Sequence, residues 1–257
     1  MSDIILKSSS ELALMRESGR LLAAVFDFLD PLVMPGISTM EINNRVEDFI
    51  INNLQARPAS KGQYNYPYTL NTSINDVVCH GMPSPTQFLK TGDIINVDIT
   101  LEKNGFVADS SKMYMVDNVS PQAKQLVNCT YEALWKGIRV VKPGATLGDI
   151  GHAIELHAAA NGYSVVREYC GHGIGRKMHE PPHVLHYGKP NSGVVLREGM
   201  IFTIEPMLNQ GTAKVKVKRD GWTVITCDKK LSAQWEHTVA VTADGFEVLT
   251  LRAEERI

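Results

Sequence analysis

Several features that would point to a secreted, membrane or disulfide-bonded protein are missing from this sequence. Its cysteines, Cys79, Cys129, Cys170 and Cys227, lie far apart, which excludes C-x-x-C motifs and the dense disulfide framework of small secreted domains. No apolar run approaches the roughly 20 residues of a membrane-spanning helix, and Met1 to Ser10 lacks the charged-then-apolar order of a secretory signal. We therefore expect a soluble cytoplasmic protein with reduced thiols and no membrane partner.

The sequence also lacks an excess of charge of one sign. Its net charge of -2 gives no general attraction to nucleic acid, which requires a basic surface, so we expect no specific nucleic-acid partner. The one basic stretch, 214–219, alternates lysine and valine like a strand with a single charged face. We interpret it as an edge strand that its charges protect from aggregation. A transient contact with RNA or the ribosome is the alternative.

Four helices are predicted from polar capping residues that stand just before amphipathic runs. They cover 12–29 after Ser8, 42–54 after Ser38, 121–141 after Ser120 and 147–161 after Thr146. Strand-like runs follow each pair of helices. Helices and antiparallel strands are therefore segregated, which favours an α+β fold over a doubly wound sheet.

A weak internal repeat divides the chain into two related parts. The pattern P-G-x-[ST]-x-x-[DE]-I occurs at 35–42 and again at 143–150, which are 108 positions apart. Gly92 precedes Asp98 by six residues, as Gly199 precedes Glu205. Since the two offsets nearly agree, we interpret the chain as two halves, about 1–118 and 119–257, that each send a carboxylate from an equivalent strand toward a shared site.

Alternation of polar and apolar residues places the candidate carboxylates on the polar faces of strands. In 95–101 Asp98 lies on the face away from the core, and Glu205 and Glu236 follow the same rule in their own segments. Asp109 follows a hairpin turn whose register has alternatives. A turn at 103 and 104 pairs Asp98 with Asp109, a turn at 104 and 105 pairs it with Ser111, and both leave the two aspartates on one face; a three-residue loop would break this unless a bulge restored it.

Taken singly, acidic residues on the polar face of a strand are usually solvated. Four of them are harder to explain, because like charges on neighbouring strands are destabilising and gain from a cation between them. His172 lies in the glycine-rich segment 170–175, where backbone can approach a ligand closely. Carboxylates together with imidazole suit Mn, Fe, Co or Zn.

Three motif-like patterns are set aside. The segment 179–183 matches H-E-x-x-H, but Pro181 and Pro182 forbid the helix that this zinc motif needs. The glycines of 171–175 lack the spacing and the following capped helix of a dinucleotide loop. Cys79 and His80 are neighbours in an extended segment and point opposite ways, so they form no nucleophilic dyad.

These residues together resemble the type I methionine aminopeptidases over nearly the whole chain. The resemblance rests on ordered, separated motifs: Val78-Cys79-His80-Gly81, Asn96-Val97-Asp98, Asp109-Ser110-Ser111-Lys112, Gly171-His172-Gly173-Ile174-Gly175, Thr203-Ile204-Glu205-Pro206 and Gln234-Trp235-Glu236-His237-Thr238. It implies one pita-bread catalytic domain over 1–257, with two pseudo-twofold-related αβ halves around a curved antiparallel sheet. The chain looks like the short bacterial form of the family.

The resemblance also implies a function and a set of roles. The expected activity is removal of the initiator methionine from nascent polypeptides and peptides with a small second residue, by a monomer that holds two divalent metal ions. Asp98 and Asp109 would hold one ion; Asp109, His172, Glu205 and Glu236 would hold the other. Glu205 would shuttle a proton. His80 and His179 would contact the substrate and stabilise the reacting groups.

Further positions follow from the same resemblance. Tyr66, Asn71, Met178 and Trp222 would line the methionine pocket, and Asn75, Val77 and Ser232 would bind a monovalent cation. The pocket departs from the common family pattern at four positions and, near the second aspartate, Ala108 replaces the usual glycine, as in a divergent second copy. The pocket departures are Ser60, Gln63, Asn71 and Met178.

Two other interpretations remain open. The same fold serves as a non-enzymatic binding protein where the metal ligands are lost, and it occurs in prolidases, which have a large additional N-terminal domain. An aminopeptidase with altered first-residue specificity is a variant of the main hypothesis. The presence of all the expected ligands and the chain length favour the methionine aminopeptidase interpretation.

Overall fold

Four α-helices begin at the capping residues that the sequence indicates. They are α1 (Ser9–Leu29), α2 (Thr39–Asp48), α3 (Pro121–Ile138) and α4 (Leu147–Ala160) in a computed structural model that describes residues 4–256. Ser8 and Thr146 each form a complete capping box, because the acidic residue three positions on also accepts a hydrogen bond from the backbone N–H of the cap. Short helical turns cover Asp30–Leu32, Phe49–Asn53 and Gln63–Asn65.

Two helices end earlier than predicted. α2 stops at Asp48 and continues as the π-helical turn Phe49–Asn53, in which the Leu54 N–H donates to the Phe49 carbonyl at 3.1 Å. α3 stops at Ile138 instead of near 141. In both places β-branched residues, which favour the α-helix weakly, follow the last helical turn, and after α2 two asparagines follow as well.

The strands are short except for one long hairpin in the first half. Their bounds are β1 Arg57–Pro58, β2 Leu70–Ile74, β3 Val77–Cys79, β4 Ile94–Lys103, β5 Phe106–Met115, β6 Ser164–Val165, β7 Gly171–Gly173, β8 Glu180–Val184, β9 Ile201–Ile204, β10 Met207–Asn209, β11 Val215–Val217, β12 Val224–Thr226, β13 Ser232–Gln234, β14 His237–Val241 and β15 Phe246–Val248. Every pairing between them is antiparallel within the described residues.

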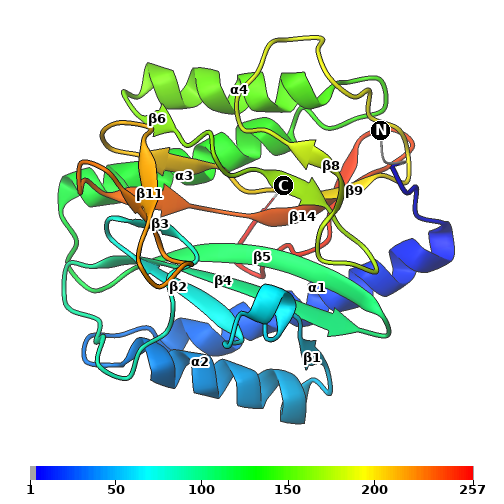
Figure 1. The fold of residues 1–257 in the computed structure, drawn as a ribbon. Coiled ribbons are helices and arrows are strands. Elements are labelled where there is room, and N and C mark those ends of the chain that lie inside the picture. The colour runs from blue at the N-terminus through cyan, green and yellow to red at the C-terminus, as the bar shows by residue number, and fades with distance from the viewer. Residues whose placement is uncertain (1–3, 257) are drawn as a thin grey trace.

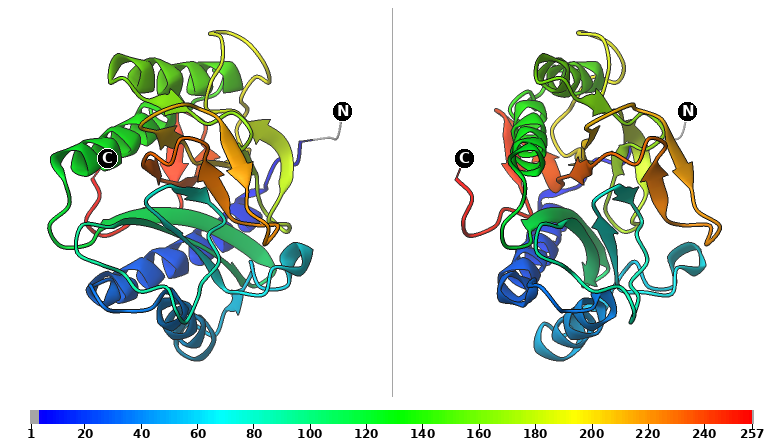
Figure 2. Two further views of the ribbon diagram at one scale, coloured as in Figure 1. Left: turned by 60° about the vertical axis from the view of Figure 1, so that its left-hand side comes forward. Right: turned by 90° about the vertical axis from the view of Figure 1, so that its left-hand side faces the viewer.

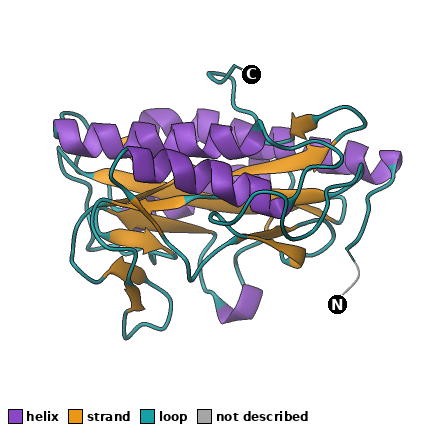
Figure 3. Cartoon of the chain, turned by 90° about the horizontal axis from the view of Figure 1, so that it is seen from above, coloured by secondary structure: helices purple, strands orange, loops and turns teal. Residues whose placement is uncertain are grey.

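The strands form two main sheets, one in each half of the chain. The first joins β1, β4, β2 and β5, and the second has the order β15-β14-β9-β7-β8. α1 and α2 lie with the first sheet in the lower part of Figure 1, whereas α3 and α4 lie with the second sheet in the upper part. Both views of Figure 2 keep these groups apart, and Figure 3 shows the long helices in a layer over the strands. The expected segregation of helices and antiparallel strands is confirmed.

The sequence repeat returns as a repeat of backbone geometry. Gly36 and Gly144 have φ angles of 90° and 88°, and their N–H groups donate to the carbonyls of Leu89 and Leu196 at 2.8 and 3.0 Å. Leu89 and Leu196 are 107 positions apart, as are Gly92 and Gly199. The boundary expected near 118 falls in the connection between β5 and α3.

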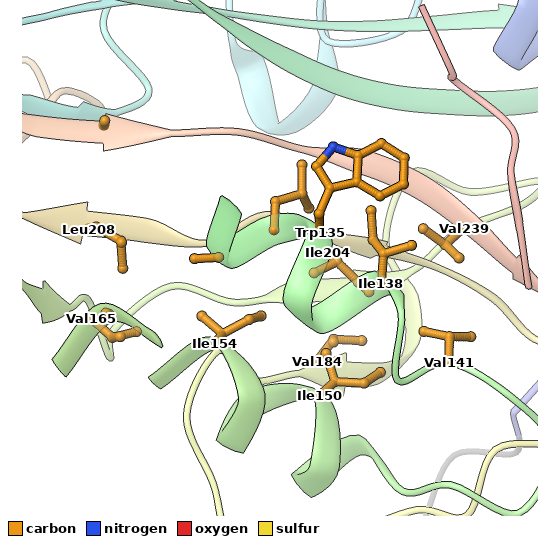
Figure 4. Packing of buried hydrophobic residues seen from close by; sticks show 14 of the residues in the cluster. Trp135, Ile138, Val141, Ile150, Ile154, Val165, Val184, Ile204, Leu208 and Val239 are labelled. Carbon is orange, nitrogen blue, oxygen red and sulfur yellow. The ribbon is translucent and has the colours of Figure 1, made fainter. Parts of the chain in front are cut away.

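Each half has its own apolar core between its helices and its sheet. Figure 4 shows the second-half cluster, in which Trp135 and Ile138 of α3 and Ile154 of α4 approach Ile204 of β9. The two helices approach closely at Gly137, where an added Cβ would lie 2.8 Å from the Ile154 Cδ1 atom. The first-half cluster packs α1 and α2 against β2 and β4. These cores hold the two sheets rigidly enough to place side chains between them.

Three simpler expectations can be compared with the fold. β11 is the end strand of the small sheet β11-β12-β3, and Lys214, Lys216 and Lys218 are exposed, so the edge-strand interpretation is confirmed. All the cysteines are free thiols. No helix in the described part of the chain is long and apolar enough to cross a membrane.

Candidate metal centre

The β4–β5 hairpin carries the two aspartates. Asn104 and Gly105 form its turn with φ angles of 53° and 79°, the two positive values of a type I′ turn. Asp98 therefore pairs with Ser111 and Asp109 pairs with Thr100, which is the second of the two predicted registers. The two carboxylates lie diagonally on one face of the hairpin.

That polar face is buried by the other half of the molecule and is not exposed to solvent. Asn96 is 2% exposed, and its amide donates to the Gln234 carbonyl at 2.8 Å and to the Ser111 hydroxyl at 3.0 Å. The Glu236 N–H donates to the Ser111 carbonyl at 3.3 Å. The polar faces of the two sheets thus meet, and the solvated interpretation of single carboxylates does not hold here.

The second half supplies the remaining candidate ligands from three strand ends. His172 lies in β7, Glu205 directly follows β9, and Glu236 lies between β13 and β14. The His172 Nε2 atom is 3.7 Å from the Asp109 Oδ2 atom and 3.6 Å from the Glu205 Oε1 atom. Asp109, His172 and Glu236 each offer an atom within 4.8 Å of the others. Glu205 lies next to this group, and Asp98 lines the same cavity as the other four predicted ligands.

Neighbouring polar groups orient these side chains. The His172 Nδ1 atom is 3.1 Å from the Gly173 carbonyl oxygen, so Nδ1 carries the proton and the Nε2 lone pair faces the carboxylates. The Thr203 hydroxyl accepts a hydrogen bond from the His172 N–H at 3.0 Å and donates to Glu205 at 2.8 Å. An imidazole held in this tautomer is suited to bind a metal ion.

Burial makes the charged carboxylates unfavourable in the protein alone. It raises the pKa of Asp98 to about 6 and that of Glu205 to about 8. Burial and the neighbouring carboxylates raise the pKa values of Asp109 and Glu236 well above the ordinary range. Burial likewise lowers the pKa of His172 to about 3, which keeps its imidazole neutral. Acidic groups crowded in this way need a cation or protons between them.

The donor set fits a divalent metal ion. Among the described residues, the buried Asp109 Oδ1 atom has no hydrogen-bond partner, as expected of an oxygen kept for a cation. Carboxylate oxygens and a neutral imidazole are ligands of Mn, Fe, Co and Zn. A bound cation would also favour the ionised carboxylates and reverse the raised pKa values.

A cavity of about 820 Å³ opens over these carboxylates. Every other residue that the sequence assigns to catalysis or to the first-residue pocket lines it: Ser60, Gln63, Tyr66, Asn71, His80, Met178, His179 and Trp222. Tyr66 and Trp222 meet edge to face with ring centroids 4.9 Å apart. The cavity thus brings together an acidic floor and an aromatic wall.

The two candidate catalytic histidines stand on the wall near the carboxylates. The His179 ring lies 4.3 Å from the His172 ring between centroids, and its Nδ1 atom is 3.3 Å from the Tyr64 hydroxyl. His80 has a positive φ of 55°. Burial lowers the pKa of His80 to about 4 and, less strongly, that of His179. Both imidazoles are therefore neutral near pH 7.

The rejected motifs stay rejected. β8 covers 180–184, so the H-E-x-x-H segment is a strand and its two histidines share no helical face. Cys79 is buried, and burial raises its pKa well above the ordinary value, so it is no nucleophile beside His80.

The Ser232 N–H donates to the Asn75 carbonyl at 2.8 Å, and the Ser232 hydroxyl has no partner among the described residues. The monovalent-cation site with Val77 stays a prediction.

Some supporting residues were not recognised from the sequence. The buried His186 accepts the Glu205 N–H through Nε2 at 3.1 Å, and no local pattern marks it. The Gln234 amide is 3.5 Å from the second Glu205 oxygen. Thr203 and Gln234 each stand two residues before a ligand on the same strand face, which is the signal that identifies them.

Antiparallel halves that enclose a buried carboxylate and imidazole centre define a class of metal-dependent hydrolases. The sequence model of metallopeptidase family M24 matches residues 13–243, and the chain belongs to this family. It is 48% identical to the methionine aminopeptidase of Escherichia coli (strain K12) over 254 residues, which cover 99% of this chain and 96% of that protein.

Solved structures agree with this assignment. The crystal structure of methionine aminopeptidase from Rickettsia prowazekii is similar with a TM-score of 0.95 and 47% identity, over 97% of this chain and all of that one. An Xaa-Pro dipeptidase from Bacillus anthracis shares the fold with a TM-score of 0.78 at 24% identity, and this chain covers 63% of its length. The expected pita-bread fold is confirmed.

Proposed function

We propose that this protein is a metal-dependent aminopeptidase that removes the initiator methionine from nascent proteins and from peptides with a small second residue. The observation that carries the proposal is the buried centre of Asp109, His172 and Glu236 at the floor of the cavity. The near full-length similarity to proteins named methionine aminopeptidase supports the choice of substrate.

We assign the metal ligands as the resemblance implies. Asp98 would hold one ion, His172 and Glu205 would hold a second, and Asp109 and Glu236 would be shared by both. Bound divalent ions would polarise the scissile carbonyl and lower the pKa of water. Co, Mn, Fe and Zn all suit these ligands, and the ion used in the cell depends on availability.

The protein groups around the centre would move protons and bind developing charge. The Thr203 hydroxyl donates to Glu205 Oε1, and the Gln234 amide lies 3.5 Å from Oε2. Glu205 held in this way would take a proton from water and return it to the leaving amine. The neutral His179 would donate an N–H to the oxyanion, and His80 would contact the substrate backbone beside the leaving amine.

Tyr66, Asn71, Met178 and Trp222 would form the pocket for the first residue. The Asn71 amide donates to the Asp98 carboxylate at 3.5 Å, and the Ser60 hydroxyl is hydrogen-bonded to the Thr100 hydroxyl. Because these polar groups already have partners, they need none from the substrate. The pocket would therefore still accept an apolar thioether despite its departures, and Gln63 also lines the cavity.

The remaining expectations complete the proposal. The substrates would be nascent polypeptides in the cytoplasm, met by a monomer in transient contact with the ribosome. Asn75, Val77 and Ser232 would bind a monovalent cation that stabilises the fold. The chain would act as one domain, 1–257.

The test is release of free methionine from a Met-Gly-Met peptide. Metal-stripped protein should be inactive, and adding back Mn, Fe, Co or Zn singly should restore release and rank the metals. Glu205→Ala should abolish the metal-dependent release while the protein stays folded. A folded, metal-loaded protein that releases no methionine would contradict the proposal and favour a binding protein or another first residue.

A further inference from the structure

A buried ion pair connects the N-terminal segment to the loop that carries His179. The Lys7 Nζ atom lies 2.6 Å from the Glu180 Oε2 atom, and both side chains are less than 5% exposed. Figure 1 shows the segment before α1 rising from the lower half of the molecule toward β8 and β9. The Lys7 N–H donates to the carbonyl of Gly199, the residue just before Met200 and β9, at 2.8 Å.

Gly175 and Gly199 pack so closely on Lys7 that neither position has space for a side chain. A Cβ added to Gly175 would lie 2.4 Å from the Lys7 Cε atom and 2.9 Å from the Glu180 Oε1 atom. A Cβ added to Gly199 would lie 3.0 Å from the Lys7 carbonyl oxygen. Lysine and glutamate are almost never buried unless paired. The close fit shows that the pair is built into the junction of the two halves.

The pair closes the turn in which His179 stands. The Lys177 N–H donates to Glu180 Oε1 at 3.2 Å, while the other oxygen of the same carboxylate binds Lys7. Glu180 therefore bridges both sides of the turn. The β7–β8 ladder is irregular here, because His172 pairs with His183 whereas Gly173 pairs with Glu180. The ladder alone thus leaves the His179 end of the strand loosely defined.

Apart from the edge-to-face packing of its ring on His172, with centroids 4.3 Å apart, the other contacts of His179 are weak restraints. Its ring is exposed, and its Nδ1 contact is to Tyr64, which is itself 65% exposed. A solvent-exposed hydrogen bond of this kind contributes little, because water competes for both partners. By contrast, the ion pair one residue away is buried and of hydrogen-bond length.

We propose that the Lys7–Glu180 ion pair is a positioning device that holds His179 at the reacting carbonyl. The inference rests on the proposed function, since it assigns the position of a residue that would bind the oxyanion. Stability is a poor explanation of the pair, because burying two charges costs about as much as their attraction returns. A positioning role explains why a buried charged pair stands at this place.

The test combines Lys7→Met and His179→Ala, singly and together, in the metal-loaded full-length protein with the Met-Gly-Met peptide. Lys7→Met should lower kcat by about 10- to 100-fold, with KM changed less than about threefold. In the His179→Ala background the same change should have no further effect on kcat. Equal losses in both backgrounds would overturn the proposal, because a structural defect does not depend on His179. Lys61→Met, which breaks the exposed pair with Glu47, is the matched control and should keep wild-type kcat.

A second variant guards against loss of folding. Lys7→Met with Glu180→Met removes both charges, and such replacements are often neutral for stability. This variant should fold with bound metal and stay slow; recovery of wild-type kcat would overturn the positioning role. The imidazole NMR signals of His179 should shift or broaden in Lys7→Met and stay unchanged in Lys61→Met. This readout holds even if wild-type protein releases no methionine, so failure of the proposed function and failure of the inference are distinguishable.

Discussion

Asp109 illustrates how a candidate metal ligand is held in the fold. Its side chain is buried, and one oxygen has no hydrogen-bond partner among the described residues. Its backbone, in contrast, is well held: its N–H donates to the Thr238 hydroxyl at 3.2 Å, and that hydroxyl donates to its carbonyl at 2.7 Å. The main chain is fixed while the carboxylate is left for a cation, which is the arrangement of a preorganised site.

Replacing this carboxylate should separate stability from metal binding. In the absence of metal, we expect the free energy of unfolding of Asp109→Asn to be about 1–3 kcal/mol higher than that of wild type. The reason is that a buried amide needs neither ionisation nor protonation. Calorimetric titration with the metal ion should show that Asp109→Asn no longer binds it. Asp117→Asn on the surface should change stability by less than about 0.5 kcal/mol. An unchanged metal affinity in Asp109→Asn would contradict the ligand assignment.

The raised pKa of Glu205 predicts an unusual pH dependence. Its folded pKa of about 8 lies above the ordinary 4.5, so between these values the folded protein keeps a proton that the unfolded chain releases. Stability of the metal-free protein should therefore fall as pH rises from 5 to 8, by up to about 1.4 kcal/mol per pH unit from this group. With metal bound the trend should reverse, since protons compete for the ligands at low pH.

Urea unfolding at several pH values, with chelator and with Mn, measures both trends. Glu205→Gln lacks the titrating group, so the metal-free difference between this variant and wild type should grow from pH 5 to pH 8. A difference independent of pH would show that Glu205 does not retain its proton in the folded state.

At the scale of elements, the β4–β5 hairpin sets the position of both aspartates. Its register depends on the turn at Asn104 and Gly105, which pairs Asp98 with Ser111; a turn one residue earlier would place Asp98 directly opposite Asp109. The Asn104 amide also donates to Glu17 of α1 at 2.9 Å. A turn remote from the cavity thus decides how the two carboxylates are spaced on the polar face of the hairpin.

Glycine at the second turn position should matter for stability and not for metal binding. Gly105→Ala forces alanine to a φ of 79°, which should lower the free energy of unfolding by about 1 kcal/mol. Gly245 has open space around its Cβ position and no positive φ, so Gly245→Ala should be neutral or slightly stabilising. Urea unfolding compares the two. Equal effects would show that backbone conformation at the turn is not limiting.

At the scale of the whole molecule, the C-terminal segment connects the two halves behind the candidate metal centre. The fully buried Arg252 donates to the Ser110 hydroxyl of β5 at 3.2 Å and to Glu255 at 2.9 Å. The Ser110 hydroxyl in turn donates to the Glu236 carbonyl at 2.7 Å. Glu255 also lies 3.1 Å from His237 of β14. The buried Arg252 guanidinium thus forms a brace that links residues next to two candidate ligands, Asp109 and Glu236.

Glu255 should make this brace sensitive to acid. Its hydrogen bonds and ion pairs outweigh burial and lower its pKa from 4.5 to about 2, which corresponds to about 3 kcal/mol of stability above pH 4.5. This stability should be lost as pH falls from 4.5 to 2. Glu255→Gln should therefore destabilise the protein at pH 7 and converge with wild type near pH 2.

Thermal unfolding against pH measures this convergence. Glu254→Gln, which removes an exposed partner of Lys112, should cost at most about 1 kcal/mol. If Glu255→Gln were no more destabilising than Glu254→Gln at pH 7, the buried brace would not contribute as described.

The sequence by itself determined the local structure and the class of site. Helix starts follow from Ser8, Ser38 and Thr146, because capping uses hydrogen bonds within one turn. The polar faces that carry Asp98 and Glu205 follow from strand alternation, and the Asn104–Gly105 turn was one of two registers that the pattern allowed. The helix ends were less accurate, since propensities there are weak. Family motifs then named the residues for which local pattern has no rule, such as His80 and His179.

Only the tertiary structure decided how these local pieces meet. Packing of one half on the other turned a solvated strand face into a buried floor and raised the pKa values of its carboxylates. It also placed His186 behind Glu205 and Lys7 beside Glu180, 173 positions away. Such contacts depend on how two apolar cores fit together in space, and hydrogen bonds over a few residues carry no information about that fit.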